Sequence, residues 1–465
     1  MIFAMSGKIR TEKKGDTAAF RLSGAELLYL AFCFLLYFCW SLAKELNYGP
    51  DEAMRYLIPE YIYRTGSLPN GYMEELRNDL WGFSYAFYPN FLGPLASALC
   101  MKVVSFVTAD AFALVAAARF PSVLAASGTV YLSMKIGKRV FPAEGVWLYV
   151  VSLSMIPQFV FLSSYVNNDM LCIFGSALML YAWVLGIQEQ WNGKNGLLLA
   201  AGIVVAALSY YNSYGWILCS MVIFAGSYIW KIGGNRDWRR MVRIGFLIAA
   251  VVLMCIGYFF IRNAVLYDGD FLGMRALGQS ADRYAAEEWR PVNRSTPQSE
   301  GMSVVEMLVS GAWTGTPWIV KTYVTFIGAF GFADVFLPLW MYGVYTLVFA
   351  AAFAGVVGKL SGYVKAVRAG ERPRDRAAAL LHVMLFFAMV IPVGLSIFYS
   401  YTSDYQAQGR YCYPMILAFC WFETEGLLWL MDWRRLAGKG RRMAAGVYCG
   451  MVIALTLAVT ATVYL

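Results

Sequence analysis

Two neighbouring carboxylates, Asp51 and Glu52, follow the first long apolar run of the chain, in a polar stretch that begins at Asn47. Burial at a low-dielectric boundary raises the pKa of a carboxyl group, and a nearby Arg opposes that shift. In this position Asp51 is suited to act as a general base toward a hydroxyl group. The structural alternative is that the pair caps a helix after Pro50 by satisfying its free backbone N–H groups.

Two further polar groups interrupt apolar runs. Arg119 lies inside an expected membrane helix, where an Arg is costly unless it snorkels to the surface, pairs with a carboxylate or binds an anion. A polar segment at 163–169 separates the next two apolar runs and ends in Asn168 and Asp169. Asp169 adds another acid, although Asn and Asp also serve as caps and can simply begin the following helix.

Near the end of the chain, Gln408 and Arg410 stand at the mouth of an apolar run. A guanidinium offers forked donors that match phosphate oxygens, so we expect Arg410 to bind a phosphate. The alternative is an anchor that faces lipid headgroups. Arg262 ends another apolar run and precedes Asp268-Gly269-Asp270, a motif that could hold a metal but is also typical of a turn.

The elements that carry these residues must be membrane helices. The chain has 465 residues, of which 60% are hydrophobic and 14% charged, and this is more apolar surface than one water-soluble core needs. Several runs reach the roughly 20 apolar residues that cross about 30 Å of hydrocarbon. The first, at 22–42, follows a basic leader without a small-residue cleavage pattern, which predicts a retained anchor.

The net charge of +9 does not indicate nucleic acid, because the Lys and Arg residues occur in short loops between apolar runs. The positive-inside rule places five basic clusters in the cytoplasm, together with the N-terminus. These clusters lie at 8–14, 135–139, 231–243, 359–376 and 434–442. The chain is therefore expected to be integral to the cytoplasmic (plasma) membrane.

Spans that fit between the clusters predict an all-α integral membrane protein of about eleven transmembrane helices, within a range of about 10–13. They are expected at 22–42, 112–134, 144–163, 170–187, 196–211, 214–230, 244–261, 335–357, 378–399, 412–431 and 443–464. Two more apolar stretches lie at 85–107 and 313–332. A crossing by either one alone would put the basic clusters that follow it on the outer side, so we expect interfacial or re-entrant helices there. In the alternative topology both of these stretches cross the membrane, and one of the short expected spans does not.

We expect a single polytopic domain over 1–465. Its two large outer segments are 44–111, with interfacial helices, and 262–334. Function is expected in these outer segments, because the cytoplasmic connections are too short to hold a nucleotide-binding domain.

The order of these features resembles the GT-C superfamily of membrane glycosyltransferases. The shared features are the acidic pair after the first helix, the surface helices, the Arg-x-Pro-Ser motif at Arg119 and the Asn/Asp-rich second outer loop. The build is similar to protein O-mannosyltransferases, to the aminoarabinose transferases of lipid A and to uncharacterised bacterial members. The resemblance covers the first half best, and in the second half it rests on the segments around Arg262, 330–332 and 404–411.

The resemblance implies an inverting transfer of a sugar from a polyprenyl-phosphate donor to an acceptor hydroxyl on the extracytoplasmic face. Asp51 would be the base, with Glu52 and Asp169 orienting the acceptor or a cation. The residues that would bind the donor phosphate are Arg410, Gln408, Tyr411, Arg262 and Arg119. Those that would contact the acceptor or sugar are Asn168, Arg55 and Tyr88.

No cofactor is expected to be required, and a divalent cation is possible but not favoured. Oligosaccharyltransferase-like members hold a divalent cation with an Asp-x-Asp motif, and Asn167-x-Asp169 departs from that motif. His382, near the cytoplasmic end of a span, is expected to be a packing residue. The expected partners are the lipid donor, membrane lipids and a glycan, lipid or protein acceptor. Two other classes stay open, a transporter or flippase for lipid-linked sugars and a non-catalytic glycan-binding scaffold.

Overall fold

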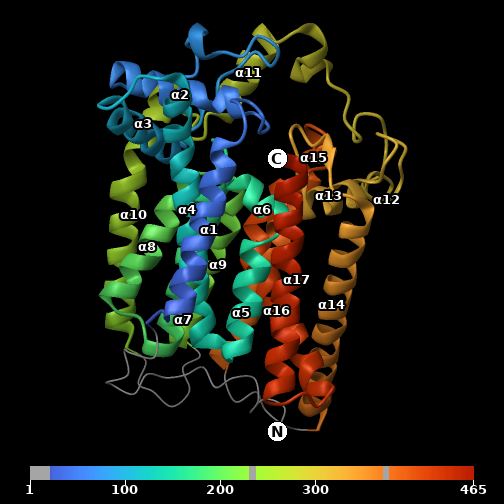
Figure 1. Cartoon of the computed structure of the whole chain (residues 1–465). Coiled ribbons are helices and arrows are strands. Elements are labelled where there is room, and N and C mark those ends of the chain that lie inside the picture. Colours follow the sequence, from blue (N-terminus) through green and yellow to red (C-terminus); the bar gives the residue numbers. More distant parts are fainter. Residues whose placement is uncertain (1–20, 230–236, 370–375, 465) are drawn as a thin grey trace.

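The computed structural model describes residues 21–229, 237–369 and 376–464, which form a bundle of long helices (Figure 1). Eight segments of the described chain are long and apolar enough to cross a membrane unaided, which confirms the all-α membrane fold. They are α1 (Gly24–Leu42), α4 (Ala111–Val140), α7 (Asp169–Glu189), α10 (Trp238–Leu266), α14 (Leu339–Arg368), α15 (Arg376–Thr402), α16 (Ile416–Trp433) with the preceding η8 (Gly409–Met415), and α17 (Lys439–Tyr464).

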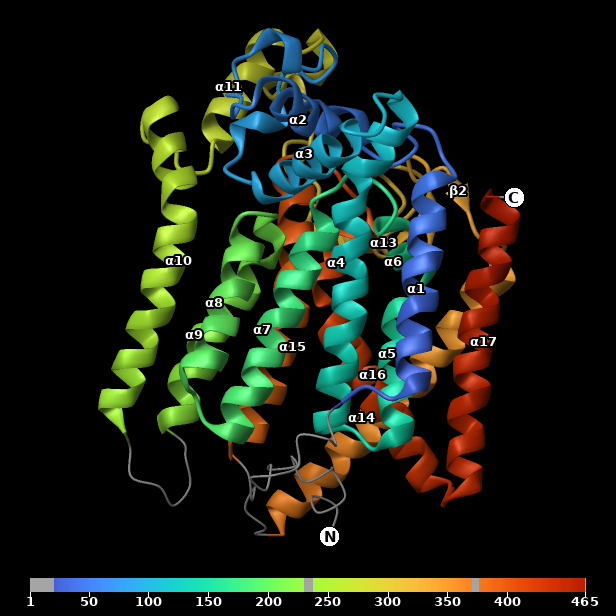
Figure 2. The same cartoon turned by 60° about the vertical axis from the view of Figure 1, so that its left-hand side comes forward.

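Shorter helices account for the other three expected spans and run alongside the long ones (Figure 2). They are α5 (Ala143–Ser154) with α6 (Pro157–Leu162), α8 (Gly193–Ala207) and α9 (Tyr214–Ile229). The expected single helix at 144–163 is broken into α5 and α6. The cause is Pro157, which has no backbone N–H to donate and whose ring clashes with the carbonyl one turn earlier.

One end of the bundle carries the short helices of the two large polar segments (Figure 1). They are α2 (Glu52–Thr65), η3 (Glu74–Leu76), η4 (Tyr85–Phe87), α3 (Leu92–Ser105), α11 (Met274–Tyr284), η6 (Glu287–Trp289) and η7 (Pro291–Asn293). We call this the α2/α3 end. Within the expected interfacial stretch 85–107, the 14-residue helix α3 lies at this end of the bundle rather than alongside the long helices (Figure 1).

The second expected interfacial stretch, 313–332, contains the helix α13 (Trp318–Ile327) and the short strand β1 (Ala329–Phe330). This strand pairs antiparallel with β2 (Val335–Phe336), and α12 (Val304–Val309) precedes the helix. With 10 residues, α13 does not form a membrane span.

The basic clusters that the structure describes lie at the opposite end of the bundle. Lys138 and Arg139 end α4, where Lys138 pairs with Glu26 at 2.9 Å and Arg139 with Glu189 at 2.7 Å. The cluster 434–442 joins α16 to α17 at the same end (Figure 2). The cluster 8–14, and parts of 231–243 and 359–376, fall outside the described residues.

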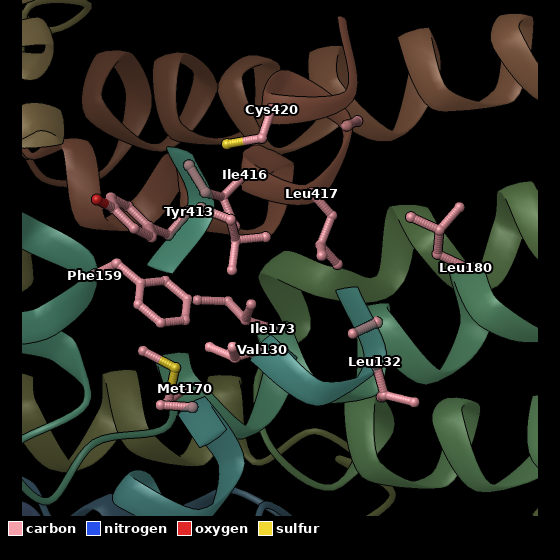
Figure 3. Close-up of a cluster of buried hydrophobic side chains, with 14 of the residues drawn as sticks. Val130, Leu132, Phe159, Met170, Ile173, Leu180, Tyr413, Ile416, Leu417 and Cys420 are labelled. Atoms are coloured by element: carbon pink, nitrogen blue, oxygen red, sulfur yellow. The ribbon is translucent and has the colours of Figure 1, made fainter. Parts of the chain in front are cut away.

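The centre of the bundle is an apolar cluster contributed by α4, α6, α7, η8 and α16 (Figure 3). Phe159 of α6, Ile173 of α7 and Tyr413 of η8 are fully buried there, each with 0% exposure. The same helices begin or end at the polar residues of interest, since α7 starts at Asp169 and η8 contains Arg410. Close packing in the core therefore fixes the height and rotation of these polar side chains.

Close contact between α14 and α16 gives the first prediction. A Cβ on Gly426 would lie 2.0 Å from the carbonyl oxygen of Ala352, so Gly426→Val must push the two helices apart. We expect a loss of about 1–3 kcal/mol, seen as a lower melting temperature in detergent. The control is Gly343→Val on α14, because no heavy atom lies within 4 Å of a Cβ there. Equal loss in both variants would contradict this packing.

A candidate active site at the α2/α3 end

Asp51 and Arg410 form an ion pair although they are far apart in the sequence. Arg410 Nη2 donates to Asp51 Oδ2 at 2.8 Å and to the hydroxyl of Tyr411 at 3.0 Å. Arg410 Nη1 donates to the carbonyl of Pro50 at 3.4 Å. The structure thus brings the expected base and the expected phosphate ligand into one place.

The backbone at Asp51 turns its carboxylate toward Arg410. Asp51 has φ 63° and ψ 7°, a left-handed conformation that Asp tolerates better than most residues. It occupies the N-cap position of α2, yet its side chain makes no cap hydrogen bond. The carboxylate therefore serves the Arg410 pair rather than the helix end.

The loop before Asp51 is held against the loop between α6 and α7. A Cβ on Gly49 would lie 2.5 Å from the ring of Tyr165, so only glycine fits at this position. Tyr165 in turn is buried and lies close enough to Arg410 and Asp51 to interact electrostatically with both. The close approach places Asp51 beside the start of α7.

Asp169, the first residue of α7, lies in the same group of charges. Its side chain is buried, and Oδ1 has no hydrogen-bond partner among the described residues. Arg410 and Arg55 both interact electrostatically with it. The neighbouring Asn167 holds the loop itself, because its amide donates to the carbonyls of Leu162 at 2.7 Å and Tyr165 at 2.8 Å.

The electrostatics of the site keep Asp51 ionised. Burial raises the pKa of Asp51, but the positive charges of Arg410 and Arg55, with a smaller effect of Tyr85, outweigh burial and leave the pKa below its usual value. Burial raises the pKa of the Tyr85 hydroxyl, which therefore stays protonated at neutral pH. The site at rest thus holds a carboxylate matched by guanidinium groups.

Glu52 faces away from this group and is fully committed to Arg119. Arg119 Nε donates to Oε1 at 2.7 Å and Nη2 to Oε2 at 2.9 Å, while the backbone N–H groups of Asn47 and Val166 donate to the same carboxylate. Glu52 has 0% and Arg119 2% exposure.

Arg119 also donates to three backbone carbonyls, so no nitrogen is left for a phosphate. These carbonyls belong to Ser41, Lys44 and Glu45, at 2.7, 2.7 and 2.8 Å. The expected catalytic role of Glu52 and the expected phosphate-binding role of Arg119 do not fit this geometry. Both residues have a structural role, and pairing with a carboxylate is what stabilises the Arg in the bundle.

Two other expected phosphate ligands are tied to neighbouring loops. Arg262 Nη2 donates to the carbonyl of Pro69 at 2.7 Å, and its guanidinium carbon lies 5.4 Å from the ring centre of Phe91. Gln408 donates to the side chain of Gln406 at 2.8 Å. In the described part of the chain neither side chain is hydrogen-bonded to Arg410, so of the expected set only Arg410 and Tyr411 meet at Asp51.

A pocket of about 520 Å³, counted with the open space at its mouth, lies between α2, α3, α4 and α7. All three residues expected to contact acceptor or sugar line it, namely Arg55, Tyr88 and Asn168. The guanidinium carbon of Arg55 lies 4.2 Å from the ring centre of Tyr85, another lining residue. Because Arg55 also interacts with Asp51, the pocket adjoins the ion pair.

Three tyrosines near the pocket, Tyr85, Tyr210 and Tyr211, are the part of the site that sequence reasoning missed, and the expected Tyr88 lies among them. Tyr88 stacks with Tyr85, with ring centres 6.2 Å apart, and packs against Tyr211, which contacts Tyr210. The available signal was the Tyr210-Tyr211 pair at the boundary between two expected spans. In the sequence alone, such a pair cannot be told apart from the aromatic residues that are enriched at membrane interfaces.

The motifs with other possible roles have local partners. Asp270 accepts the backbone N–H groups of Gly273 and Ala276, each at 3.0 Å, and so begins α11 as a turn. His382 is more than a packing residue, because it contacts Glu425 at 2.9 Å, and Lys359 pairs with the same carboxylate at 2.8 Å. The described residues contain no group of three potential metal ligands, and metal dependence stays a prediction.

A family model described as "Predicted membrane protein (DUF2142)" matches residues 67–419, a stretch that includes Arg410 and most of the pocket. No curated protein matches the sequence significantly. The solved structures give matches of fold at low sequence identity.

A crystal structure of ArnT from Cupriavidus metallidurans bound to undecaprenyl phosphate matches with a TM-score of 0.51 and 14% identity, over 94% of this chain and 70% of that one. The apo Archaeoglobus fulgidus oligosaccharyltransferase matches with a TM-score of 0.54 and 13% identity, over 93% of this chain and 55% of that one. Archaeoglobus fulgidus AglB in complex with an inhibitory peptide and a dolichol-phosphate matches with a TM-score of 0.53 and 13% identity, over 94% of this chain and 56% of that one.

ArnT and AglB are GT-C glycosyltransferases, so the expected GT-C-like membrane fold is confirmed. The chain spans little more than half the length of the two oligosaccharyltransferase chains.

The two adjacent acids are expected to respond differently to the same change. Glu52→Gln leaves the buried Arg119 charge without its counter-ion and should cost about 3–5 kcal/mol of folding free energy. Asp51→Asn should cost less, because that side chain is 27% exposed and Arg410 keeps its bonds to Tyr411 and Pro50. Thermal unfolding in detergent measures both, and equal losses would contradict the division of roles.

Proposed function

We propose that this chain, which belongs to the DUF2142 family of predicted membrane proteins, is a glycosyltransferase that takes its sugar from a lipid-linked phosphate. The observation that carries the proposal is the ion pair between Asp51 and Arg410, an ionised acid and a guanidinium held together at one end of a GT-C-like bundle. The pair offers a base for a hydroxyl and a partner for a phosphate within a few ångströms.

The α2/α3 end is proposed to face away from the cytoplasm. The described basic clusters lie at the other end, where the positive-inside rule places the cytoplasm. A donor reaching the site would keep its apolar tail in the bilayer and raise only its phosphate to Arg410.

The donor phosphate is proposed to bind Arg410. Arg410 Nε is buried without a hydrogen-bond partner among the described residues, so it offers an unused donor beside Nη2. The Tyr411 hydroxyl lies 3.0 Å from Nη2 and supplies a second polar contact. The comparison structures of ArnT and AglB hold undecaprenyl phosphate and dolichol-phosphate, which supports a prenyl-phosphate donor here.

In the proposed reaction, Asp51 takes the proton of the acceptor hydroxyl. The acceptor oxygen forms a bond to the anomeric carbon while the bond from that carbon to the phosphate oxygen breaks, which inverts the configuration. The electron pair leaves with the prenyl phosphate, and Arg410 stabilises the negative charge that develops there. No further reactant is needed to balance the step.

Donor binding would also strengthen the base. In the resting site Arg410 lowers the pKa of Asp51. A phosphate that draws Arg410 toward itself weakens this effect, so the pKa of Asp51 rises and the carboxylate becomes a better proton acceptor. The ion pair therefore makes base strength depend on the presence of the donor.

Asp51→Asn is expected to keep the fold and lower sugar transfer by about 10²–10⁴-fold, because the amide cannot take the hydroxyl proton. The measurement is transfer of a radiolabelled sugar in membranes that contain the protein. The matched control is Glu60→Gln, a second acid of α2 that lies outside the site. A flippase or a scaffold would retain its effect on surface glycans without Asp51, and wild-type transfer by Asp51→Asn would exclude the proposed mechanism.

The pH dependence follows from the lowered pKa of Asp51. Because only the carboxylate is active, kcat/KM should stay constant on acidification until the pH falls below the ordinary Asp value of about 3.9. In Arg410→Gln the largest opposing charge is gone and burial raises the pKa, so the acid limb of the residual activity should move to higher pH. An acid limb that does not move would show that the pair does not control the base.

A further inference from the structure

The pocket beside α2 contains one charged side chain, Arg55, and no carboxylate among its lining residues. In the part of the chain that the structure describes, the Arg55 guanidinium makes no hydrogen bond or ion pair, and its Nε is buried without a partner. Its contact is with the face of the Tyr85 ring, which leaves the N–H groups at the edge of the guanidinium unused. The charge of Arg55 interacts at longer range with Asp51 and Asp169, but its hydrogen-bond donors are not used by them. The guanidinium can therefore still donate hydrogen bonds to an oxyanion in the pocket.

Three other polar side chains line the same pocket and, among the described residues, are likewise without side-chain hydrogen bonds. They are Tyr88, Asn90 and Asn168. Each can donate a hydrogen bond to an oxygen atom. Asn168 is also the N-cap of α7, a helix of 21 residues whose N-terminal end carries partial positive charge. The free polar groups of the pocket therefore match an oxyanion such as a carboxylate or a phosphate.

The pocket is distinct from the position proposed for the donor phosphate. Arg55 lies one helical turn after Asp51 on α2, while Arg410 approaches Asp51 from η8. Neither Asp51 nor Arg410 lines the pocket. Two guanidinium groups thus stand near one base, and a prenyl-phosphate donor with a single phosphate occupies one of them.

We infer that the acceptor of this enzyme is an acidic molecule whose carboxylate or phosphate binds Arg55 in this pocket and so places its hydroxyl at Asp51. The inference rests on the proposed function, and it names the class of acceptor. The lining also includes the apolar side chains of Ile58, Pro94 and Leu171, which suit contact with the carbon atoms of such an acceptor. The donor phosphate and the acceptor anion then bind separate cations.

The experiment measures binding of small probes to the purified full-length protein in detergent. Methyl glucuronoside and glycerol phosphate represent the two acidic groups, methyl glucoside is the neutral match, and farnesyl phosphate represents the donor. Charge-assisted hydrogen bonds to Arg55 should make an acidic probe bind at least about tenfold more tightly than the neutral one. Arg55→Gln should remove this difference, and Arg55→Lys should keep part of it.

Two controls separate the acceptor pocket from the donor site. Arg55→Gln should leave farnesyl phosphate binding unchanged, whereas Arg410→Gln should weaken it and spare the acidic probes. Arg64→Gln changes an exposed arginine of the same helix and should alter neither. Loss of farnesyl phosphate binding in Arg55→Gln, or equal binding of acidic and neutral probes to the wild type, would overturn the inference. Unaltered farnesyl phosphate binding in Arg410→Gln would instead count against the proposed donor site.

Discussion

The buried ion pair between Glu52 and Arg119 is the constraint on which the site depends. Its two side chains come from α2 and α4, and their other bonds reach the end of α1 and the loop before α7. Four segments that are remote in the sequence are therefore fixed beside Asp51. The pair of Asp51 and Arg410 can rearrange when a ligand binds, because the neighbouring pair of Glu52 and Arg119 holds the surrounding segments in place.

Much of the fold could be predicted from the sequence, since the hydrocarbon thickness sets the length of apolar runs and the basic loops set their direction. Each expected span has a helical counterpart in the described residues. The break at Pro157 was missed because the residues on both sides are equally apolar, so only the ring of the proline marks it. Hydropathy reports burial in lipid and is insensitive to a local turn of the backbone.

The site was predicted only in part, for reasons that lie in tertiary contacts. Asp51 and Glu52 have the same chemistry and adjacent positions, and the positive φ that separates their roles is not visible in the sequence. Arg119 and Arg410 likewise both appear in the sequence as arginines beside or within apolar runs. Arg119 is saturated by Glu52 and backbone carbonyls, whereas Arg410 retains an unused nitrogen. Spacing identified the candidate charges, and the partners of each charge decide its role.

The short helices α8 and α9 have a consequence for the lipid around the protein. With 15 and 16 residues they measure about 22 and 24 Å, less than the roughly 30 Å of a typical hydrocarbon layer. The connection between them, which contains Tyr210 and Tyr211, lies deeper in the bundle than the end of α10 (Figure 2). One response to such hydrophobic mismatch is a thinner adjoining leaflet, in which the headgroups come inward. A long-chain carrier would then meet the protein with its polar head already lowered to the depth of the tyrosines.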